Sequence, residues 1–358
     1  MSAPLEFLLA LQAECGGAIP VERYLREALY HPEHGYYARN IRTVGRRGDF
    51  STSASLGEAL GSGVAHWLGK NRLPARGPWH VIEAGAGTGE LARTVLRRLG
   101  LWRRRGLMYH IVETSPVLRA EQQRNLPQFR VQWHEAMPAA LAACDGRALI
   151  FSNELIDAFP CRLFERRDGA WTEIGVRIEG GRVVEVAIDR PPPTSSAFDH
   201  ALSEGQRVEV HTSAAEWIAS WAAGVREARL LTIDYGDTMP GLYHRRPRGT
   251  LRAYFHQQRY EGAEVYYRFG KQDLTADVNF TDLRNWTERC GWRTVALTTQ
   301  TEFLAAHGAV HTGLHDAQLA DHTGAGGAFK VLEQERINPT PAPLPGHSPA
   351  LANAPRSA

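Results

Sequence analysis

The spacing of hydrophobic residues changes near residue 78 of the chain. In the first 75 residues apolar side chains recur at helical spacing in two runs, residues 5–12 and 21–29. Beyond residue 78, short apolar runs of strand type alternate with helical stretches. The strand-type runs span residues 80–82, 108–112, 129–133, 148–151, 230–234, 292–297 and 329–332. Strands that alternate with helices predict a parallel sheet covered by helices on both faces.

This pattern predicts an α/β fold with a doubly wound, mostly parallel, seven-stranded Rossmann-like sheet formed by residues 79–158 and 226–335. Residues 1–78 are expected to form an N-terminal helical segment. Between residues 159 and 225, two strand-type runs flank Gly180-Gly181, a typical hairpin turn, so we expect a β-rich insertion that shapes substrate access. Proline and alanine dominate residues 336–358, which predicts a disordered tail.

Composition narrows the class of protein. The chain has 358 residues, 43% of them hydrophobic, and a formal net charge of +2. It can therefore bury a sizeable core, but it does not carry the charge that would coat nucleic acid. The four cysteines stand far apart, which favours reduced thiols over disulfides. Because no apolar stretch is long enough to cross a bilayer, we expect a cytoplasmic protein without membrane association.

A glycine-rich loop follows the strand-type run at residues 80–82. Gly85, Gly87 and Gly89 are spaced G-x-G-x-G and lead into a helical stretch. Glycines in this position let the backbone approach a ligand closely. A dinucleotide site would need its third glycine where Glu90 stands, and a carboxylate there would repel a pyrophosphate. The spacing therefore favours S-adenosylmethionine as the cofactor and leaves a nicotinamide-dependent oxidoreductase as the weaker alternative.

Two acidic residues support the same cofactor. Glu83 precedes the loop, where a carboxylate complements the ammonium and sulfonium groups of S-adenosylmethionine. Glu113 ends the next strand-type run, where a carboxylate can accept hydrogen bonds from both ribose hydroxyls. Dinucleotide enzymes also have an acidic residue that binds the ribose, so only the glycine spacing distinguishes S-adenosylmethionine from a dinucleotide here.

Polar residues follow the strand-type run at residues 148–151. In an open parallel sheet the ligand crevice lies beyond the carboxyl ends of the strands. Asn153, Glu154 and Asp157 stand at such an end and are candidate catalytic residues: methyl transfer to nitrogen needs positioning, and a carboxylate can take the proton that the nitrogen loses. The structural alternative is that Asn153 caps a helix whose first turn contains Glu154.

The order of these motifs resembles the MidA-type class I S-adenosylmethionine-dependent methyltransferases, relatives of a mitochondrial complex I assembly factor that methylates a protein arginine. The resemblance covers most of residues 31–304. It rests on the glycine loop and on PEHGYY at 32–37, GDFSTS at 48–53, VETSP at 112–116, NELIDAFP at 153–160, DYG at 234–236, GTLRAY at 249–254, DLTADVNF at 273–280 and TTQ at 298–300.

The resemblance implies a methyl transfer to nitrogen, most plausibly on a protein arginine side chain. It further implies that the loop carrying Asp49, Phe50, Thr52 and Ser53 covers the cofactor, that Thr114 lies beside it, and that Asn153 and Glu154 stand near the transferred methyl group. A protein substrate is expected rather than nucleic acid, and a homodimer stays open. A catalytically weak cofactor-binding assembly chaperone is the main alternative function.

Three other patterns are given structural interpretations. His307, His311, His315 and His322 recur in a glycine-rich stretch without an acidic or cysteine partner, so no metal is expected. The arginines at 97, 98 and 103–105 suit the solvated end of a helix. Ser195, Ser196 and His200 lack the Gly-x-Ser-x-Gly elbow of a hydrolase.

Overall fold

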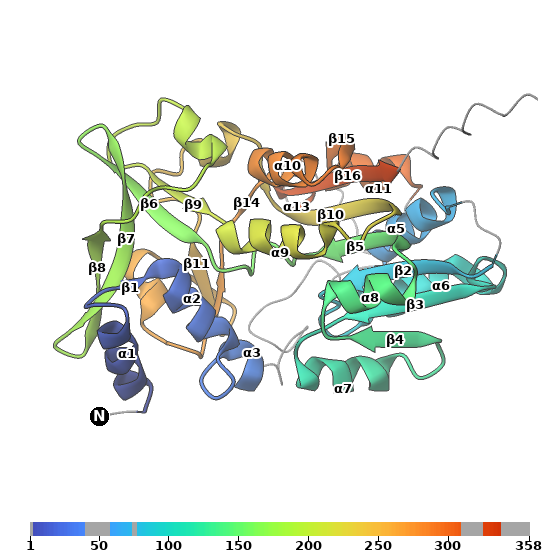
Figure 1. The fold of residues 1–358 in the computed structure, drawn as a ribbon, viewed down its shortest axis with the longest axis horizontal. Coiled ribbons are helices and arrows are strands. Elements are labelled where there is room, and N and C mark those ends of the chain that lie inside the picture. The colour runs from blue at the N-terminus through green and yellow to red at the C-terminus, as the bar shows by residue number, and fades with distance from the viewer. Residues whose placement is uncertain (1–2, 40–57, 74–76, 309–324, 338–358) are drawn as a thin grey trace, which may run out of the picture.

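The computed structural model describes residues 3–39, 58–73, 77–308 and 325–337. A mostly parallel sheet dominates one half of the molecule, and a second lobe of antiparallel strands and N-terminal helices forms the other half (Figure 1). Within the described residues, no helix is both long and apolar enough to cross a membrane.

The large sheet has the strand order β15-β16-β10-β5-β2-β3-β4, and β14 pairs with β10 beside this path. All neighbours are parallel except β16, which is antiparallel to both β10 and β15. The strands are β2 (Trp79–Ala84), β3 (Leu107–Val112), β4 (Val131–His134), β5 (Arg147–Asn153), β10 (Glu227–Asp237), β14 (Val278–Asn279), β15 (Arg293–Thr299) and β16 (Phe329–Ile337).

This sheet confirms the α/β class and the parallel arrangement that alternation along the sequence predicted. Seven strands lie on one path, and β14 makes an eighth, so the expected number was one short. From β2 the chain runs outward to β3 and β4, whereas β5 and β10 lie on the other side of β2. The carboxyl ends of β2 and β5 therefore flank the point where the strand order reverses, which is where ligands bind in open α/β sheets.

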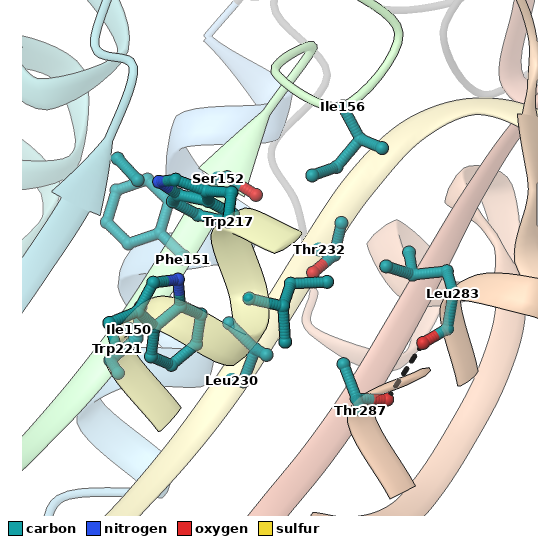
Figure 2. A pocket seen from close by; sticks show the side chains of 12 residues that line it. Ile150, Phe151, Ser152, Ile156, Trp217, Trp221, Leu230, Thr232, Leu283 and Thr287 are labelled. Atoms are coloured by element: carbon teal, nitrogen blue, oxygen red, sulfur yellow. Dashed lines mark hydrogen bonds between the residues drawn. The ribbon is translucent and has the colours of Figure 1, made fainter. Parts of the chain in front are cut away.

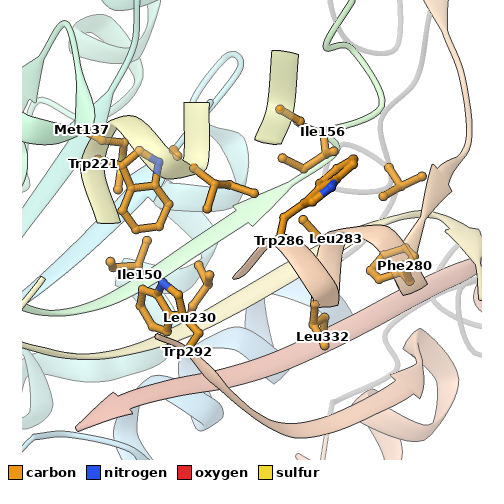
Figure 3. Close-up of a cluster of buried hydrophobic side chains, with 14 of the residues drawn as sticks. Met137, Ile150, Ile156, Trp221, Leu230, Phe280, Leu283, Trp286, Trp292 and Leu332 are labelled. Atoms are coloured by element: carbon orange, nitrogen blue, oxygen red, sulfur yellow. The ribbon is translucent and has the colours of Figure 1, made fainter. Parts of the chain in front are cut away.

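Helices cover both faces of the sheet. One face packs against α5 (Ala59–Lys70), α6 (Glu90–Arg104) and α11 (Gln300–Ala306). The other packs against α8 (Met137–Ala143), α9 (Thr212–Ala222) and α10 (Phe280–Arg289), and Figure 3 shows Trp221 of α9 beside Ile150 of β5 and Trp286 of α10 nearer Ile156. Ile156, from the turn after β5, belongs to the same cluster, so the core fixes that turn from below.

The second lobe is formed by three separate parts of the chain. Its five-stranded sheet has the order β1-β7-β6-β9, with β8 on β7, and a three-stranded sheet has the order β12-β11-β13. The elements are α1 (Ala3–Glu14), β1 (Ile19–Pro20), α2 (Val21–Tyr30), α3 (Tyr36–Arg39), β6 (Arg162–Arg167), β7 (Ala170–Glu179), β8 (Arg182–Ile188), β9 (Arg207–Val210), β11 (Arg252–Phe255), β12 (Gln258–Glu261) and β13 (Asp273–Thr275).

The expected division of the chain differs from the structure in two places. Helices α1 and α2 do not form a separate N-terminal segment; they share a hydrophobic cluster with β6 and β7. Residues 251–276, expected within the sheet domain, belong to that cluster too. The strands of this stretch have three or four residues, too few to produce a readable period. The hairpin predicted at Gly180-Gly181 is confirmed as β7–β8.

Candidate active site

The glycine loop joins β2 to α6, and its three glycines have φ angles of +71°, +52° and +82° at Gly85, Gly87 and Gly89. Only glycine adopts these angles without cost. A Cβ at Gly85 would lie 2.7 Å from Leu155 Cδ1, so the turn after β5 packs directly on the loop. A Cβ at Gly87 would meet nothing within 4 Å. The loop therefore presents bare backbone at Gly87, next to the turn that carries the candidate catalytic residues.

The loop is held in place from α7 (Pro116–Asn125). The fully buried Gln122 donates from Nε2 to the carbonyl of Gly87 at 2.8 Å and accepts from Trp133 Nε1 at 3.0 Å. Asn125 Nδ2 donates to the carbonyl of Thr88 at 2.8 Å. The sequence showed no sign of this role, because a glutamine in an amphipathic helix is usually a surface residue.

Glu113 directly follows β3, beside the loop, and is 7% exposed. Its Oε1 accepts from the Ser115 amide at 2.9 Å, and its Oε2 accepts from Gln122 Nε2 at 3.1 Å. The Thr114 amide also acts as a hydrogen-bond donor to this carboxylate, so of its roughly four lone-pair positions about one stays free for a further donor. Burial raises the pKa of Glu113, and these hydrogen bonds partly oppose that rise. Its contact with the ribose hydroxyls stays a prediction; Thr114, next to it, is exposed.

Glu83 is more deeply placed than its proposed cofactor contact suggested. It is 2% exposed, and its Oε2 accepts from the hydroxyl of Tyr109 at 2.6 Å. Burial raises the pKa of Glu83 to about 7, although the Tyr109 hydrogen bond opposes that rise. Near neutral pH a neighbouring cation would therefore favour the ionised carboxylate.

The turn after β5 brings together the three candidate catalytic residues. No helix follows Asn153; the next element is β6, so the helix-capping alternative is wrong. Glu154 has a φ of +49°, an unusual angle for a non-glycine residue, and its amide donates to the carbonyl of Ile233 at 3.0 Å. Strained backbone that the surroundings hold in place is typical of functional sites.

Asp234 fixes this turn from β10. It is fully buried, and its Oδ2 accepts from the amides of Leu155 at 3.2 Å, Ile156 at 2.8 Å and Asp157 at 3.3 Å. Burial raises the pKa of Asp234 well above its ordinary value, and the charge of Asp157 adds to that effect. Asp234 stood in a motif that the sequence singled out, but nothing in its local pattern indicated a clamp on residues 77–79 positions earlier in the chain.

Asp157 faces the second lobe and is 6% exposed. Its Oδ2 accepts from Thr275 Oγ1 at 2.8 Å, whereas its Oδ1 has no hydrogen-bond partner among the residues that the structure describes. Burial raises the pKa of Asp157. A buried carboxylate oxygen without a donor is costly, so Oδ1 retains acceptor capacity that the described residues do not use.

The structure therefore places the glycine loop, Glu113 and the Asn153–Asp157 turn at one edge of the sheet. Asp49, Phe50, Thr52 and Ser53 lie outside the described residues. A cavity of about 10 Å³ lies deeper, between β5, β10 and helices α9 and α10. Figure 2 shows that Ile150, Leu230 and Trp221 line it. It has room for about one water molecule and is not the cofactor site.

The patterns given structural interpretations are explained by local contacts. Ser195 Oγ donates to Asp282 Oδ2 at 2.6 Å and caps a short helical turn, which is a structural role. His307 packs against His66 and Phe303, and the other three histidines lie outside the described residues. Arg97 and Arg98 pair with Glu58, as expected at a solvated helix surface.

Comparison with known proteins decides the family. Residues 59–298, more than half of the chain, match a family described as "Putative S-adenosyl-L-methionine-dependent methyltransferase". The chain belongs to this family. The methyltransferase uses S-adenosylmethionine as its cofactor, as the glycine spacing predicted, which goes against the oxidoreductase alternative.

Solved structures and characterised relatives agree with this assignment. The methyltransferase is similar to a Burkholderia thailandensis protein crystallised with S-adenosyl-homocysteine, with 28% identity, a TM-score of 0.81, and coverage of 93% of this chain and 92% of that one. It is 27% identical over 317 residues to the mitochondrial protein arginine methyltransferase NDUFAF7 homolog of Drosophila melanogaster, covering 77% of this chain and 68% of the relative. With mitochondrial NDUFAF7 of Danio rerio the identity is 28%, covering 83% and 74%.

The described residues fit this cofactor. The bare backbone at Gly87 leaves a cradle that a Cβ would fill, and the Glu113 carboxylate keeps acceptor capacity for a ligand hydroxyl. Gln122 contacts both groups, so the loop and the carboxylate are held by one side chain.

Proposed function

We propose that this methyltransferase methylates the guanidinium group of a protein arginine. The observation that carries the proposal is Oδ1 of Asp157, which is buried and has no hydrogen-bond partner among the described residues. Asp157 lies in the same turn as Leu155, which packs on the glycine loop. A guanidinium is a planar cation with N–H donors that match carboxylate oxygens. The names of the relatives in Drosophila melanogaster and Danio rerio, both protein arginine methyltransferases, support the same target.

Positioning and proton removal are the two demands of this reaction. When bound, the cofactor supplies a methyl group on a sulfonium, and S-adenosylhomocysteine leaves as the S–C bond breaks. The guanidinium nitrogen forms the new N–C bond and loses one proton. Asp157 is suited to accept that proton because burial raises its pKa above that of an exposed aspartate. Asn153 and Glu154, held by the strained turn, orient the nitrogen toward the glycine loop.

The test is the chemical identity of the methylated residue. The protein is incubated with methyl-labelled S-adenosylmethionine and a cell extract, and labelled proteins are digested and analysed by mass spectrometry. We expect methylarginine, formed with wild-type protein and with Asp168→Asn, and at least tenfold less with Asp157→Asn. Asp168 lies in the β6–β7 turn at a φ of +51°, which asparagine tolerates, so it is a matched control.

Two other results would contradict the proposal. Label on lysine, on carboxyl groups or on nucleic acid would mean that the site serves another nucleophile. Binding of S-adenosylmethionine without any methylated product would favour an assembly chaperone that keeps the cofactor site.

A further inference from the structure

Strand β13 of the second lobe lies directly against the turn after β5. The amide of Ala276 donates to the carbonyl of Asp157 at 3.2 Å, and Thr275 Oγ1 donates to its carboxylate at 2.8 Å. Residues two apart on a strand point to the same side. Asp273 therefore shares the face of β13 from which Thr275 reaches Asp157, and it brings a second carboxylate to this junction.

Asp273 is buried, with 8% of its surface exposed. Its Oδ1 accepts from the hydroxyl of Tyr37, on α3, at 3.1 Å. Burial, and then the charge of Asp157, raise the pKa of Asp273 to about 7. Two buried carboxylates that repel each other are stabilised by a cation placed beside them.

The chain does not supply a cation dedicated to this pair within its described residues. Arg252 on β11 lowers the pKa of both carboxyls, but its guanidinium is engaged with other groups. It forms an ion pair with Asp277 and donates to the carbonyl of Thr250 at 3.2 Å. Among the residues that the structure describes, none thus neutralises the carboxylate pair, which suits it to a bound cation.

Aromatic side chains stand beside the pair. The rings of Tyr30 and Tyr37 stack with their centroids 5.3 Å apart, and Tyr30 donates from its hydroxyl to the carbonyl of Ala158 at 2.8 Å. A guanidinium stacks on aromatic faces and binds carboxylates through parallel N–H groups. Both lobes therefore contribute groups that suit a flat cation.

We propose that Asp273 and Asp157 form a guanidinium-selective subsite across the two lobes, with Tyr37 as the positioning residue for Asp273. This inference rests on the proposed function and deepens it, because it assigns specificity for the target to the second lobe. The N-terminal helices and β13 then form part of the substrate site rather than only a support for the fold.

The test measures binding of small probes and needs no identified target. Methylguanidinium, and neutral methylurea of similar shape, are titrated calorimetrically into protein saturated with S-adenosylhomocysteine. We expect methylguanidinium to bind at least about tenfold more tightly than methylurea, the advantage of a charge-assisted hydrogen bond. Asp273→Asn, which still accepts from Tyr37, loses that advantage, whereas Asp168→Asn keeps it.

The pH dependence of binding separates a direct role from a structural one. Because the cation binds the ionised carboxylate, wild-type affinity for methylguanidinium falls as the pH drops below about 7. Asp273→Asn removes most of this dependence, and Tyr37→Phe shifts its midpoint. Equal binding of both probes, or unchanged binding and pH dependence in Asp273→Asn, would overturn the inference.

The two proposals can fail separately. If methylarginine forms at the same rate with Asp273→Asn as with wild-type protein, the reaction stands and the subsite is wrong. If methylguanidinium binds as expected but no methylarginine forms, the subsite stands and the proposed reaction is wrong.

Discussion

The substitution Gly87→Ala tests cofactor binding separately from folding stability. Gly87 has a φ of +52°, and a Cβ built on it meets nothing within 4 Å. In Gly87→Ala the free energy of unfolding of the ligand-free protein therefore falls only by the cost of the left-handed backbone angle, about 1–2 kcal/mol. The new methyl group projects into the space that the cofactor is expected to occupy.

The chain offers a matched control for the backbone strain. Gly180, in the β7–β8 turn of the second lobe, has a φ of +56° and the same empty surroundings for a Cβ. Gly180→Ala should lower the free energy of unfolding by the same amount as Gly87→Ala. It should leave cofactor binding unchanged.

Affinity for S-adenosylhomocysteine is measured by titration calorimetry, and stability by denaturant unfolding. Forcing a methyl group against a packed ligand costs about 2 kcal/mol, which is roughly a 30-fold rise in Kd. We expect this rise in Gly87→Ala only. If Gly87→Ala and Gly180→Ala bind the ligand within about threefold of each other, a difference below 1 kcal/mol, the cofactor does not lie on Gly87 and the reasoning fails.

Three further predictions concern groups that support the site. Gln122→Leu leaves the Gly87 carbonyl and Oε2 of Glu113 without the donor that Gln122 supplies, so the unfolding free energy falls by about 2–4 kcal/mol and Kd for S-adenosylhomocysteine rises; an unchanged Kd would mean that Gln122 does not position the loop and Glu113 for the ligand. Asp234→Asn replaces an acceptor of three amides, so we expect kcat to fall at least tenfold, and an unaffected kcat would mean that the turn needs no clamp. Burial, and the charges of His134 and His80, lower the pKa of His110 to about 4; between pH 7 and pH 5 this group alone lowers the unfolding free energy by about 2 kcal/mol, whereas Glu83 and Asp273, whose pKa values are raised to about 7, act in the opposite direction. The His110 contribution is therefore read as the difference between the pH profiles of wild-type protein and His110→Gln in a denaturant series, and parallel profiles would contradict the assignment.

The sequence predicted the parts of the site that are local in the chain. The strand, the G-x-G-x-G loop and the helix after it lie within residues 79–104, and Glu113 follows one strand later. Each is readable because alternation, glycine spacing and strand ends are short-range features. These features allowed the cofactor, and the edge of the sheet at which it binds, to be predicted from the sequence.

The supporting groups were missed because they act over long sequence separations. Tyr37 and Asp273 are 236 residues apart, and Thr275 and Asp157 are 118 apart. No periodicity connects such residues, and strands β13 and β14, of three and two residues, are too short to carry a pattern of their own. The same reason explains why α1 and α2 were assigned to a separate segment rather than to the second lobe. Folding alone brings these groups to the site.

Hydrogen–deuterium exchange with and without S-adenosylhomocysteine tests most directly that the glycine loop, Glu113 and the turn after β5 form one ligand site. The account predicts slower exchange in peptides spanning residues 84–90, 113–118 and 153–158, with no change in the β7–β8 hairpin and none on addition of NAD. Protection confined to other parts of the chain, or produced equally by NAD, would contradict it.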